Sequence, residues 1–170
     1  MIEVLERDAP DMLIFDYEKK GRLIRGFSGP TECLTNDRDA LVGGVFAGRM
    51  LHAWLRITHR RLWEGVSFPA IRTYEDVVTT PILALRANSF YYRALPVIWY
   101  RFRKGSLLES VRCGRFDSAK HDEFVIALSS LKSEMQSRLP EVGTETRFAV
   151  SHFITKEFIK ICYRAIRSGM

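Results

Sequence analysis

Two adjacent carboxylates, Glu75 and Asp76, are the residues of this chain whose type and position best suit chemistry. They stand directly before an apolar run over residues 77–87 that predicts a helix, and a helix start would hold both side chains in place. A carboxylate held in this way can act as a general base that removes a proton from a hydroxyl group. A structural interpretation is also open, because residues 73–76 match a capping box and acids in a first helical turn offset the helix dipole.

Basic residues gather downstream of this acidic pair. Between residues 86 and 115 there are seven basic residues and one acid, Glu109, and this excess equals the net charge of +6 of the whole chain. Such a segment would attract a polyanion, for example a nucleoside diphosphate, a nucleic acid or an anionic lipid headgroup. The alternative is a strand edge that its cations keep soluble. The basic residues are Arg86, Arg93, Arg101, Arg103, Lys104, Arg112 and Arg115.

An aromatic residue and a cation, Trp54 and Arg56, lie upstream of the acidic pair. Alternation over residues 54–57 predicts an extended segment with these two side chains on one face. This pairing suits sugar or nucleotide binding, because a ring face stacks on apolar C–H surface, although a tryptophan in the core would give the same pattern. His52 and His59 have no partner at metal-ligand spacing, so we predict structural roles for both.

The elements that must position these residues alternate between strand and helix, which predicts an α/β fold. A buried strand is predicted over residues 12–15, followed by a hairpin to residues 22–24. A helix should begin at Asn36 or Asp37, and its glycines indicate close packing or a pliable element. Paired strands over residues 89–103, turning at residues 94–96, should follow the helix that Glu75 opens.

The chain changes character near residue 115, where two amphipathic helices are predicted, one starting at Ser118 and one after residue 144. We therefore divide it into residues 1–115 and 116–170. The last helix has an apolar face that we predict to include Phe148, Phe153 and Phe158. It also has basic residues at helical spacing, which suits either an anionic membrane surface or a helix packed on the body with a solvated basic side. These basic residues are Lys156, Lys160, Arg164 and Arg167.

Composition excludes several classes of protein. With 46% apolar residues the chain is globular rather than disordered, and no apolar run approaches the length needed to span a bilayer. Three widely spaced cysteines argue against a disulfide framework and a zinc site, and favour a reducing compartment. Asp16 and Glu18 end the first predicted strand and could bind a metal, but the hairpin that follows favours a structural role.

The order of features over residues 54–106 resembles the second half of bacterial family-2 inverting glycosyltransferases, which have the GT-A fold. The resemblance covers about residues 1–110, and the nucleotide-binding half of the family normally lies upstream of this part. The residues that carry it are Trp54 and Arg56, the basic turn His59-Arg60-Arg61, Phe68-Pro69, Tyr74-Glu75-Asp76, and the ending Tyr100-Arg101-Phe102-Arg103-Lys104-Gly105-Ser106.

The resemblance implies a partial GT-A-like α/β fold, with a short mixed sheet and flanking helices, over residues 1–115. The amphipathic patterns of residues 116–170 add a C-terminal helical hairpin. The resemblance implies transfer of a sugar from a nucleotide-sugar donor to a hydroxyl group of a glycan or lipid-linked acceptor, in cell-surface polysaccharide synthesis. The cytoplasm, at the inner face of the plasma membrane, is the expected location. The intact enzyme would need a divalent metal, Mg²⁺ or Mn²⁺, with ligands upstream, so we expect this chain alone to be inactive.

The resemblance also assigns roles to residues. Asp76 would be the catalytic base and Glu75 would orient the acceptor. The remaining assignments are Arg101, Arg103 and Ser106 for the donor phosphates, and Trp54 and Arg56 for the acceptor.

A non-catalytic alternative remains open. The chain could be a basic interaction module that binds a partner protein or an anionic membrane surface. We do not expect a nucleic-acid partner, because the sequence contains no recognisable nucleic-acid motif.

Overall fold

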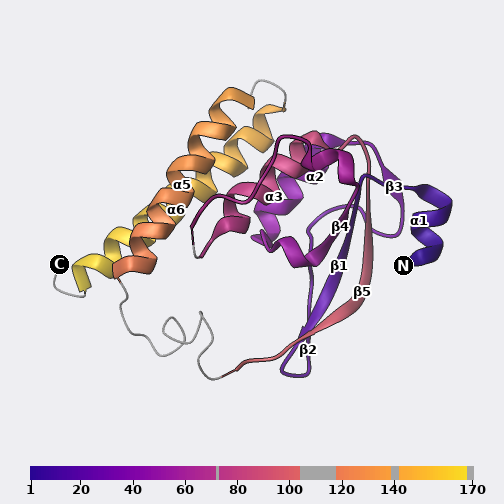
Figure 1. Cartoon of the computed structure of the whole chain (residues 1–170), viewed down its shortest axis with the longest axis horizontal. Helices are drawn as coiled ribbons and strands as arrows, with labels where there is room; N and C mark the ends of the chain where they lie inside the picture. The colour runs from indigo at the N-terminus through magenta and orange to yellow at the C-terminus, as the bar shows by residue number, and fades with distance from the viewer. Residues whose placement is uncertain (72, 104–117, 139–141, 168–170) are drawn as a thin grey trace.

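The computed structural model describes residues 1–71, 73–103, 118–138 and 142–167. Within these ranges, helices flank a mixed five-stranded sheet that is not closed, which confirms the predicted α/β class (Figure 1). The α-helices are α1 (Ile2–Asp8), α2 (Arg38–Gly48), α3 (Glu75–Arg86), α5 (Ser118–Arg138) and α6 (Thr144–Arg167). The strands are β1 (Met12–Lys19), β2 (Arg22–Ile24), β3 (Leu34–Thr35), β4 (Arg56–Thr58) and β5 (Phe90–Tyr100), and the short 3₁₀ helices are η1 (Ala53–Leu55) and η2 (Arg60–Trp63).

Strand β1 is the centre of the sheet. Its first four residues are apolar and buried, as expected for a strand with neighbours on both sides. It pairs antiparallel with β2 and β4 and parallel with β5, and β3 extends the sheet beyond β5. Tyr17 lies opposite Ile24 in the β1–β2 pairing, so the predicted hairpin is confirmed.

The hairpin predicted over residues 89–103 is wrong. Phe90–Tyr100 is one continuous strand, β5, which runs along β1. Its register against β1 shifts between Arg93 and Ile98, so extra residues bulge out of the ladder where a turn was expected. Pro96 lies in this irregular part, because a proline has no N–H to donate and is tolerated in a sheet at such places.

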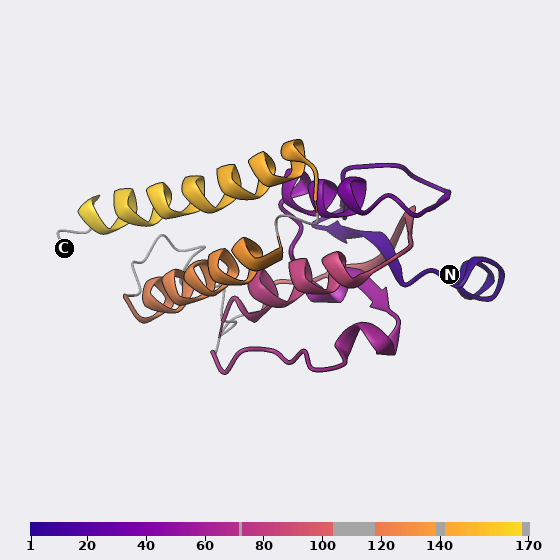
Figure 2. The same cartoon turned by 90° about the horizontal axis from the view of Figure 1, so that it is seen from above.

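The helices form two pairs, as Figure 2 shows: α6 runs beside α2, and α5 runs beside α3. The helical hairpin α5–α6 shares one hydrophobic core with the sheet, α2 and α3. Buried members of this core from the different elements include Met12, Ile14, Val42, Val45, Leu83, Tyr92, Leu128, Leu131, Met135, Phe153 and Ile161.

The buried face of α6 agrees with the sequence prediction in most positions. Phe153, Ile154 and Ile161 are buried, and Phe158 packs against the same core while remaining partly exposed. The prediction for Phe148 is wrong, because its side chain is 72% exposed. The 3.6-residue period of the helix places it on a different side from Phe153.

The acids around the start of α2 have structural roles. Asp37 is the N-cap of the helix, and its Oδ1 accepts a hydrogen bond from the backbone N–H of Ala40 at 3.0 Å. The backbone N–H of Gly143 donates to Oδ1 of Asp39 at 2.7 Å, which ties the start of α6 to α2. The predicted helix start is therefore confirmed. Both carboxylates have structural roles, since Asp37 caps α2 and Asp39 connects α2 to the start of α6.

Asp11 fastens the start of β1 to the loop that follows α3. Its Oδ2 accepts hydrogen bonds from the backbone N–H groups of Asn88 (2.7 Å) and Ser89 (3.3 Å), and its Oδ1 accepts one from Nε of Arg61 (3.1 Å). Burial alone would raise the pKa of this carboxyl group. The hydrogen bonds and the Arg61 charge outweigh that effect, and the pKa of Asp11 lies below its usual value.

We predict that Asp11→Asn lowers the free energy of unfolding at neutral pH by about 2 kcal/mol, because charge-assisted hydrogen bonds to buried donors are lost. A lowered folded-state pKa means that the stabilisation is complete above the unfolded-state pKa of about 4 and is lost as the pH falls through the folded-state value. Urea unfolding of both proteins across the acidic range should therefore show their difference shrinking. A difference that stays constant with pH would contradict this explanation.

Candidate functional site

Asp76 lies at the start of α3, as its second residue. Its side chain is 20% exposed, so solutes can reach the carboxylate, and its Oδ2 is 3.3 Å from Nδ1 of His52. The unpaired N–H groups and the dipole of the helix start favour negative charge at this point. The neighbouring Glu75 is the first residue of α3 and is partly exposed.

The turn before α3 does not have the predicted capping box. The N-cap residue is Tyr74, which has a left-handed backbone (φ 68°) and makes no side-chain cap. Thr73 instead donates its hydroxyl hydrogen to the carboxylate of Glu123 in α5, and the ring of Tyr74 packs on Phe124 with centroids 4.5 Å apart. A left-handed tyrosine costs on the order of 1 kcal/mol or more, so contacts with α5 must hold this turn. Helix α5 thereby positions the acidic pair.

A row of stacked rings joins Asp76 to the end of β5. The indole of Trp54 stacks with His52 (centroids 5.1 Å apart, planes at 13°) and with Tyr100 (5.7 Å, 23°). The ring of Tyr17 meets Trp54 edge-on at 5.1 Å. Much of the ring surface of Trp54 is therefore engaged within the protein, which leaves less of it for a bound sugar than the sequence suggests.

Arg56 is buried, with 8% of its surface exposed. It starts β4, whereas Trp54 lies in η1, so the prediction of one extended segment over residues 54–57 is wrong. Its two terminal nitrogens donate to the backbone carbonyl groups of His52 (2.5 Å) and Met50 (2.6 Å). Burial lowers the pKa of Arg56 to about 10, against the attraction of Asp76, so the guanidinium stays charged at neutral pH. In this position it supports the segment that carries His52.

Arg101 and Arg103 are exposed just beyond the end of β5, and Phe102 between them is partly buried. Ser106, the third residue assigned to the donor phosphates, lies outside the described residues. Of the other basic residues in this segment, Arg86 donates to two backbone carbonyl groups and Arg93 lies 3.7 Å from a carboxylate oxygen of Glu32.

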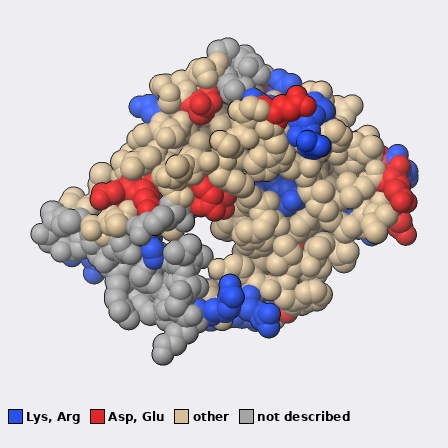
Figure 3. Space-filling model, in the orientation of Figure 1, with Lys and Arg blue, Asp and Glu red and all other residues tan. Residues whose placement is uncertain are grey.

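Two lysines that the sequence analysis did not single out join this basic end. Lys19 and Lys20 end β1 and begin its turn, and their Nζ atoms lie 4.9 Å and 5.3 Å from the ring centroid of Phe102. Figure 3 shows Lys and Arg side chains gathered at the lower edge of the molecule, over β2 and the end of β5. We call Lys19, Lys20, Arg101 and Arg103 the cationic tip.

A shallow depression of about 620 Å³ lies at this tip, lined by Glu18, Lys20, Trp99, Tyr100 and Arg101. The ring of Trp99 is 67% exposed, and its Nε1 donates to Oε2 of Glu18 at 3.0 Å. An exposed ring beside cations can stack on a nucleotide base or a sugar while the cations contact phosphate. Trp99 lies opposite Glu18 in the register of β5 against β1, so the depression depends on the sheet and has no signal in the local sequence.

The carboxylates at the end of β1 do not fit a divalent metal. Asp16 is buried, and its Oδ1 accepts hydrogen bonds from the backbone N–H of Gly26 (2.8 Å) and the hydroxyl group of Tyr92 (2.6 Å). Glu18 is partly exposed and bonds to Trp99 instead, so the two carboxylates do not converge. Among the described residues, no group of three or more His, Cys, Asp or Glu side chains is placed to hold a metal ion.

The chain matches no protein-family model, no characterised protein and no solved structure with significance. The resemblance to family-2 glycosyltransferases therefore stays a prediction based on the quoted residues. Within the described ranges, no helix has the length and apolar character needed to cross a bilayer.

Proposed function

We propose that this chain forms the acceptor-side half of an inverting glycosyltransferase in which Asp76 takes the proton from the acceptor hydroxyl group. The observation that supports this best is the setting of Asp76. Its carboxylate is accessible at a helix start, bonded to His52, and linked by the stacked ring of Trp54 to Tyr100, which adjoins the cationic tip. The arrangement is consistent with a base and an anion-binding surface, which are two of the requirements of the reaction.

The base has one chemical task. The acceptor oxygen forms a bond to the anomeric carbon of the sugar. At the same time the bond between the anomeric carbon and the diphosphate oxygen breaks, and the electron pair of that bond leaves with the diphosphate oxygen. The acceptor proton moves to the carboxylate of Asp76. General-base help of this kind accelerates a reaction by about 10²- to 10⁴-fold.

His52 and Arg56 act on the base through position. We infer that Nδ1 of His52, 3.3 Å from Oδ2 of Asp76, carries the hydrogen and donates it to that oxygen, which leaves Oδ1 for the acceptor hydroxyl group. The guanidinium of Arg56 holds the carbonyl groups of Met50 and His52, and thereby fixes the segment from which His52 extends. Both are positioning residues, and the acceptor contact assigned to Arg56 is not part of this proposal.

The cationic tip would bind the departing diphosphate. Arg101 and Arg103 are joined there by Lys19 and Lys20, and several cations at one end of the sheet stabilise a polyanion better than one does. Trp99 offers an open ring face for the base or the sugar of the donor.

The product stereochemistry tests this function. The protein expressed from its complete reading frame should be incubated with labelled UDP- and GDP-sugars and with hydroxyl-bearing glycan or lipid-linked acceptors. We expect transfer with inversion at the anomeric carbon, detected by NMR of the product. Retention of configuration, or nucleotide-sugar turnover that ignores the acceptor, would contradict direct attack by an acceptor that Asp76 deprotonates.

The same assay tests whether the cationic tip binds the donor. Arg101→Ala combined with Arg103→Ala should raise the donor KM by on the order of tenfold or more, because charge-assisted contacts to phosphate are lost. Arg60→Ala, which removes an exposed cation from η2, serves as the control and should leave the donor KM near the wild-type value. Equal effects of the two variants would show that the tip has no specific part in donor binding.

A further inference from the structure

Helix α6 carries a second apolar row on the side that faces solvent. Four large side chains in this row are between 59% and 73% exposed, namely Phe148, Ile159, Tyr163 and Ile166. The 3.6-residue period places all four on one side of the helix. A helix that buries one face normally shows polar residues on its other side. Ile159, Tyr163 and Ile166 follow one another at spacings of four and three residues, so they form an exposed apolar patch of the kind that marks an interaction surface.

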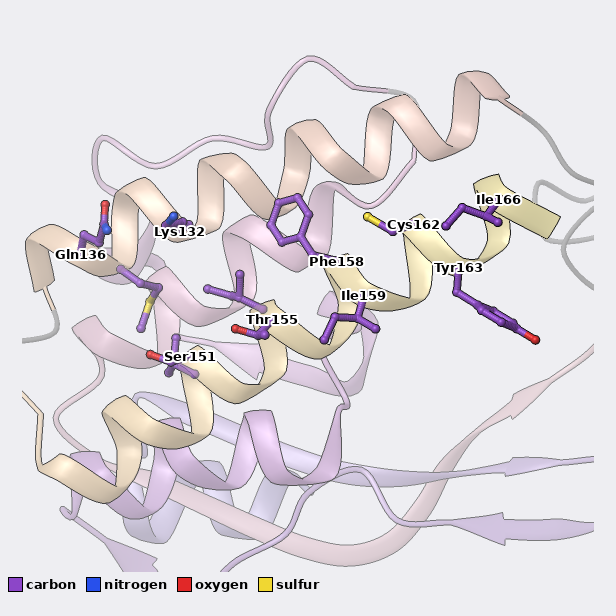
Figure 4. Close-up of a pocket in the computed structure, with 12 residues that line it drawn as sticks. Lys132, Gln136, Ser151, Thr155, Phe158, Ile159, Cys162, Tyr163 and Ile166 are labelled. Carbon is purple, nitrogen blue, oxygen red and sulfur yellow. The ribbon is translucent and has the colours of Figure 1, made fainter. Parts of the chain in front are cut away.

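An apolar groove runs beside this row, between α5 and α6, with a volume of about 650 Å³ (Figure 4). Figure 4 shows Phe158 reaching toward α5 and Tyr163 pointing away from it. Helix α5 contributes Lys132, Met135 and Gln136 to the lining, and none of the described residues that line the groove is an Asp or a Glu. The groove includes Ile159, Tyr163 and Ile166 of the exposed row in its lining, so the groove and the row form one larger apolar surface.

Cations follow the other flank of the row. Lys156, Lys160, Arg164 and Arg167 recur three or four residues apart, while Glu157 is the one acid between residues 148 and 167. The carboxylate of Glu157 is bonded to Arg49 and to Lys160 at 2.9 Å. The solvent-facing side of α6 is therefore apolar in its middle and positive along one edge.

We propose that α6 docks on an anionic membrane surface, with Ile159, Tyr163 and Ile166 entering the boundary between headgroups and acyl chains. Cations on the flank then reach the lipid phosphates, and each contributes about 1 kcal/mol near such a surface. The helix would lie in the plane of the interface, and the groove would take apolar lipid surface. Membrane docking of α6 is separate from sugar transfer, and the binding experiment below does not require transferase activity.

Other occupants fit the surface less well. A second copy would bring its cationic flank against a groove whose described lining contains Lys132 and no Asp or Glu, so like charges would meet. A nucleic acid would use the cations but leave the apolar row in water.

Vesicle flotation of the purified chain tests the proposal. We expect binding to phosphatidylcholine vesicles that contain phosphatidylglycerol, with at least roughly tenfold weaker binding to phosphatidylcholine alone and at high salt. Ile159→Ser combined with Ile166→Ser should weaken binding to the anionic vesicles by on the order of tenfold, because two apolar side chains no longer enter the bilayer. Both positions are exposed, so the fold should persist, and thermal unfolding checks this.

Charge reversal provides the matched control. Lys156→Glu combined with Arg164→Glu should reduce binding at least roughly tenfold, whereas Arg22→Glu combined with Arg60→Glu, an equal charge change away from α6, should retain it. If the two double variants lost vesicle binding equally, the proposal would be overturned, because net charge alone would then explain the attraction to the vesicles. Failure to bind anionic vesicles would also overturn it. So would a dimer in size-exclusion light scattering that the paired Ile substitutions dissociate, which would identify a second copy as the occupant.

Discussion

Asp76→Asn should abolish sugar transfer, lowering kcat by about 10²- to 10⁴-fold in the protein expressed from its complete reading frame. Asparagine has nearly the same shape as aspartate, and its side-chain oxygen can still accept the hydrogen bond from His52, but it cannot take up a proton at neutral pH. The donor KM should therefore change little. Initial rates of acceptor-dependent nucleoside diphosphate release would measure both quantities.

Glu75→Gln is the matched comparison for this variant. It makes the same charge change one residue earlier at the same helix start, so both variants lose a similar interaction with the helix dipole, of about 0.3–1 kcal/mol. We expect Glu75→Gln to raise the acceptor KM with a smaller loss of kcat, as befits a residue that orients the acceptor. If Asp76→Asn kept more than about a tenth of the wild-type kcat, Asp76 could not be the base.

Gly44→Ala should lower the free energy of unfolding by about 2–3 kcal/mol. A Cβ atom at this position would lie 2.4 Å from Cζ of Phe27 and 2.4 Å from the carbonyl oxygen of Ser28. The ring of Phe27 cannot move aside easily, because it packs edge-on against Phe90 (5.4 Å) and Tyr92 (5.5 Å) in the core. The close-packing interpretation of the α2 glycines therefore holds at this position.

The neighbouring glycine of α2 is the control. A Cβ atom at Gly43 would meet only Oγ1 of Thr146, at an ordinary distance of 3.6 Å. Gly43→Ala should therefore stabilise the protein by about 0.5–1 kcal/mol, because alanine loses less backbone freedom in a helix. Urea unfolding of the two variants should give opposite signs, and a shared sign would mean that the packing around α2 differs from this description.

Local patterns predict much of the fold. Asp37 caps α2 as expected, because capping depends on neighbours in the sequence. Helical periodicity is also local, so the apolar run after Glu75 forms α3 as predicted and Leu128 and Leu131 are buried in α5, although the capping box predicted before α3 does not form. Pro81 lies inside α3, deeper than the first turn in which prolines are best tolerated. Burial of that helix on both sides, which is a tertiary effect, overrides the local preference.

The predictions that are wrong or incomplete concern residues whose partners are distant in the sequence. Residues 94–96 have the composition of a turn, yet they form a bulge in β5, which pairs with β1. The local sequence does not indicate that β1 is the partner. His52 has no partner at metal-ligand spacing in the sequence, but Asp76, 24 residues away, lies 3.3 Å from its Nδ1 in the structure. The resemblance assigns Arg56 to the acceptor, but the folded loop buries its side chain against the backbone carbonyl groups of Met50 and His52.

Chemical rescue of Asp76→Ala tests whether the carboxylate of Asp76 is the base. Removing the side chain leaves space at the start of α3, and formate can diffuse into it and accept the proton in place of the missing carboxylate. We predict that formate raises the single-turnover rate of sugar transfer by Asp76→Ala by on the order of tenfold or more, with inverted product and no effect on the wild-type rate. An Asp76→Ala variant that transfers sugar at the wild-type rate without formate would contradict the account.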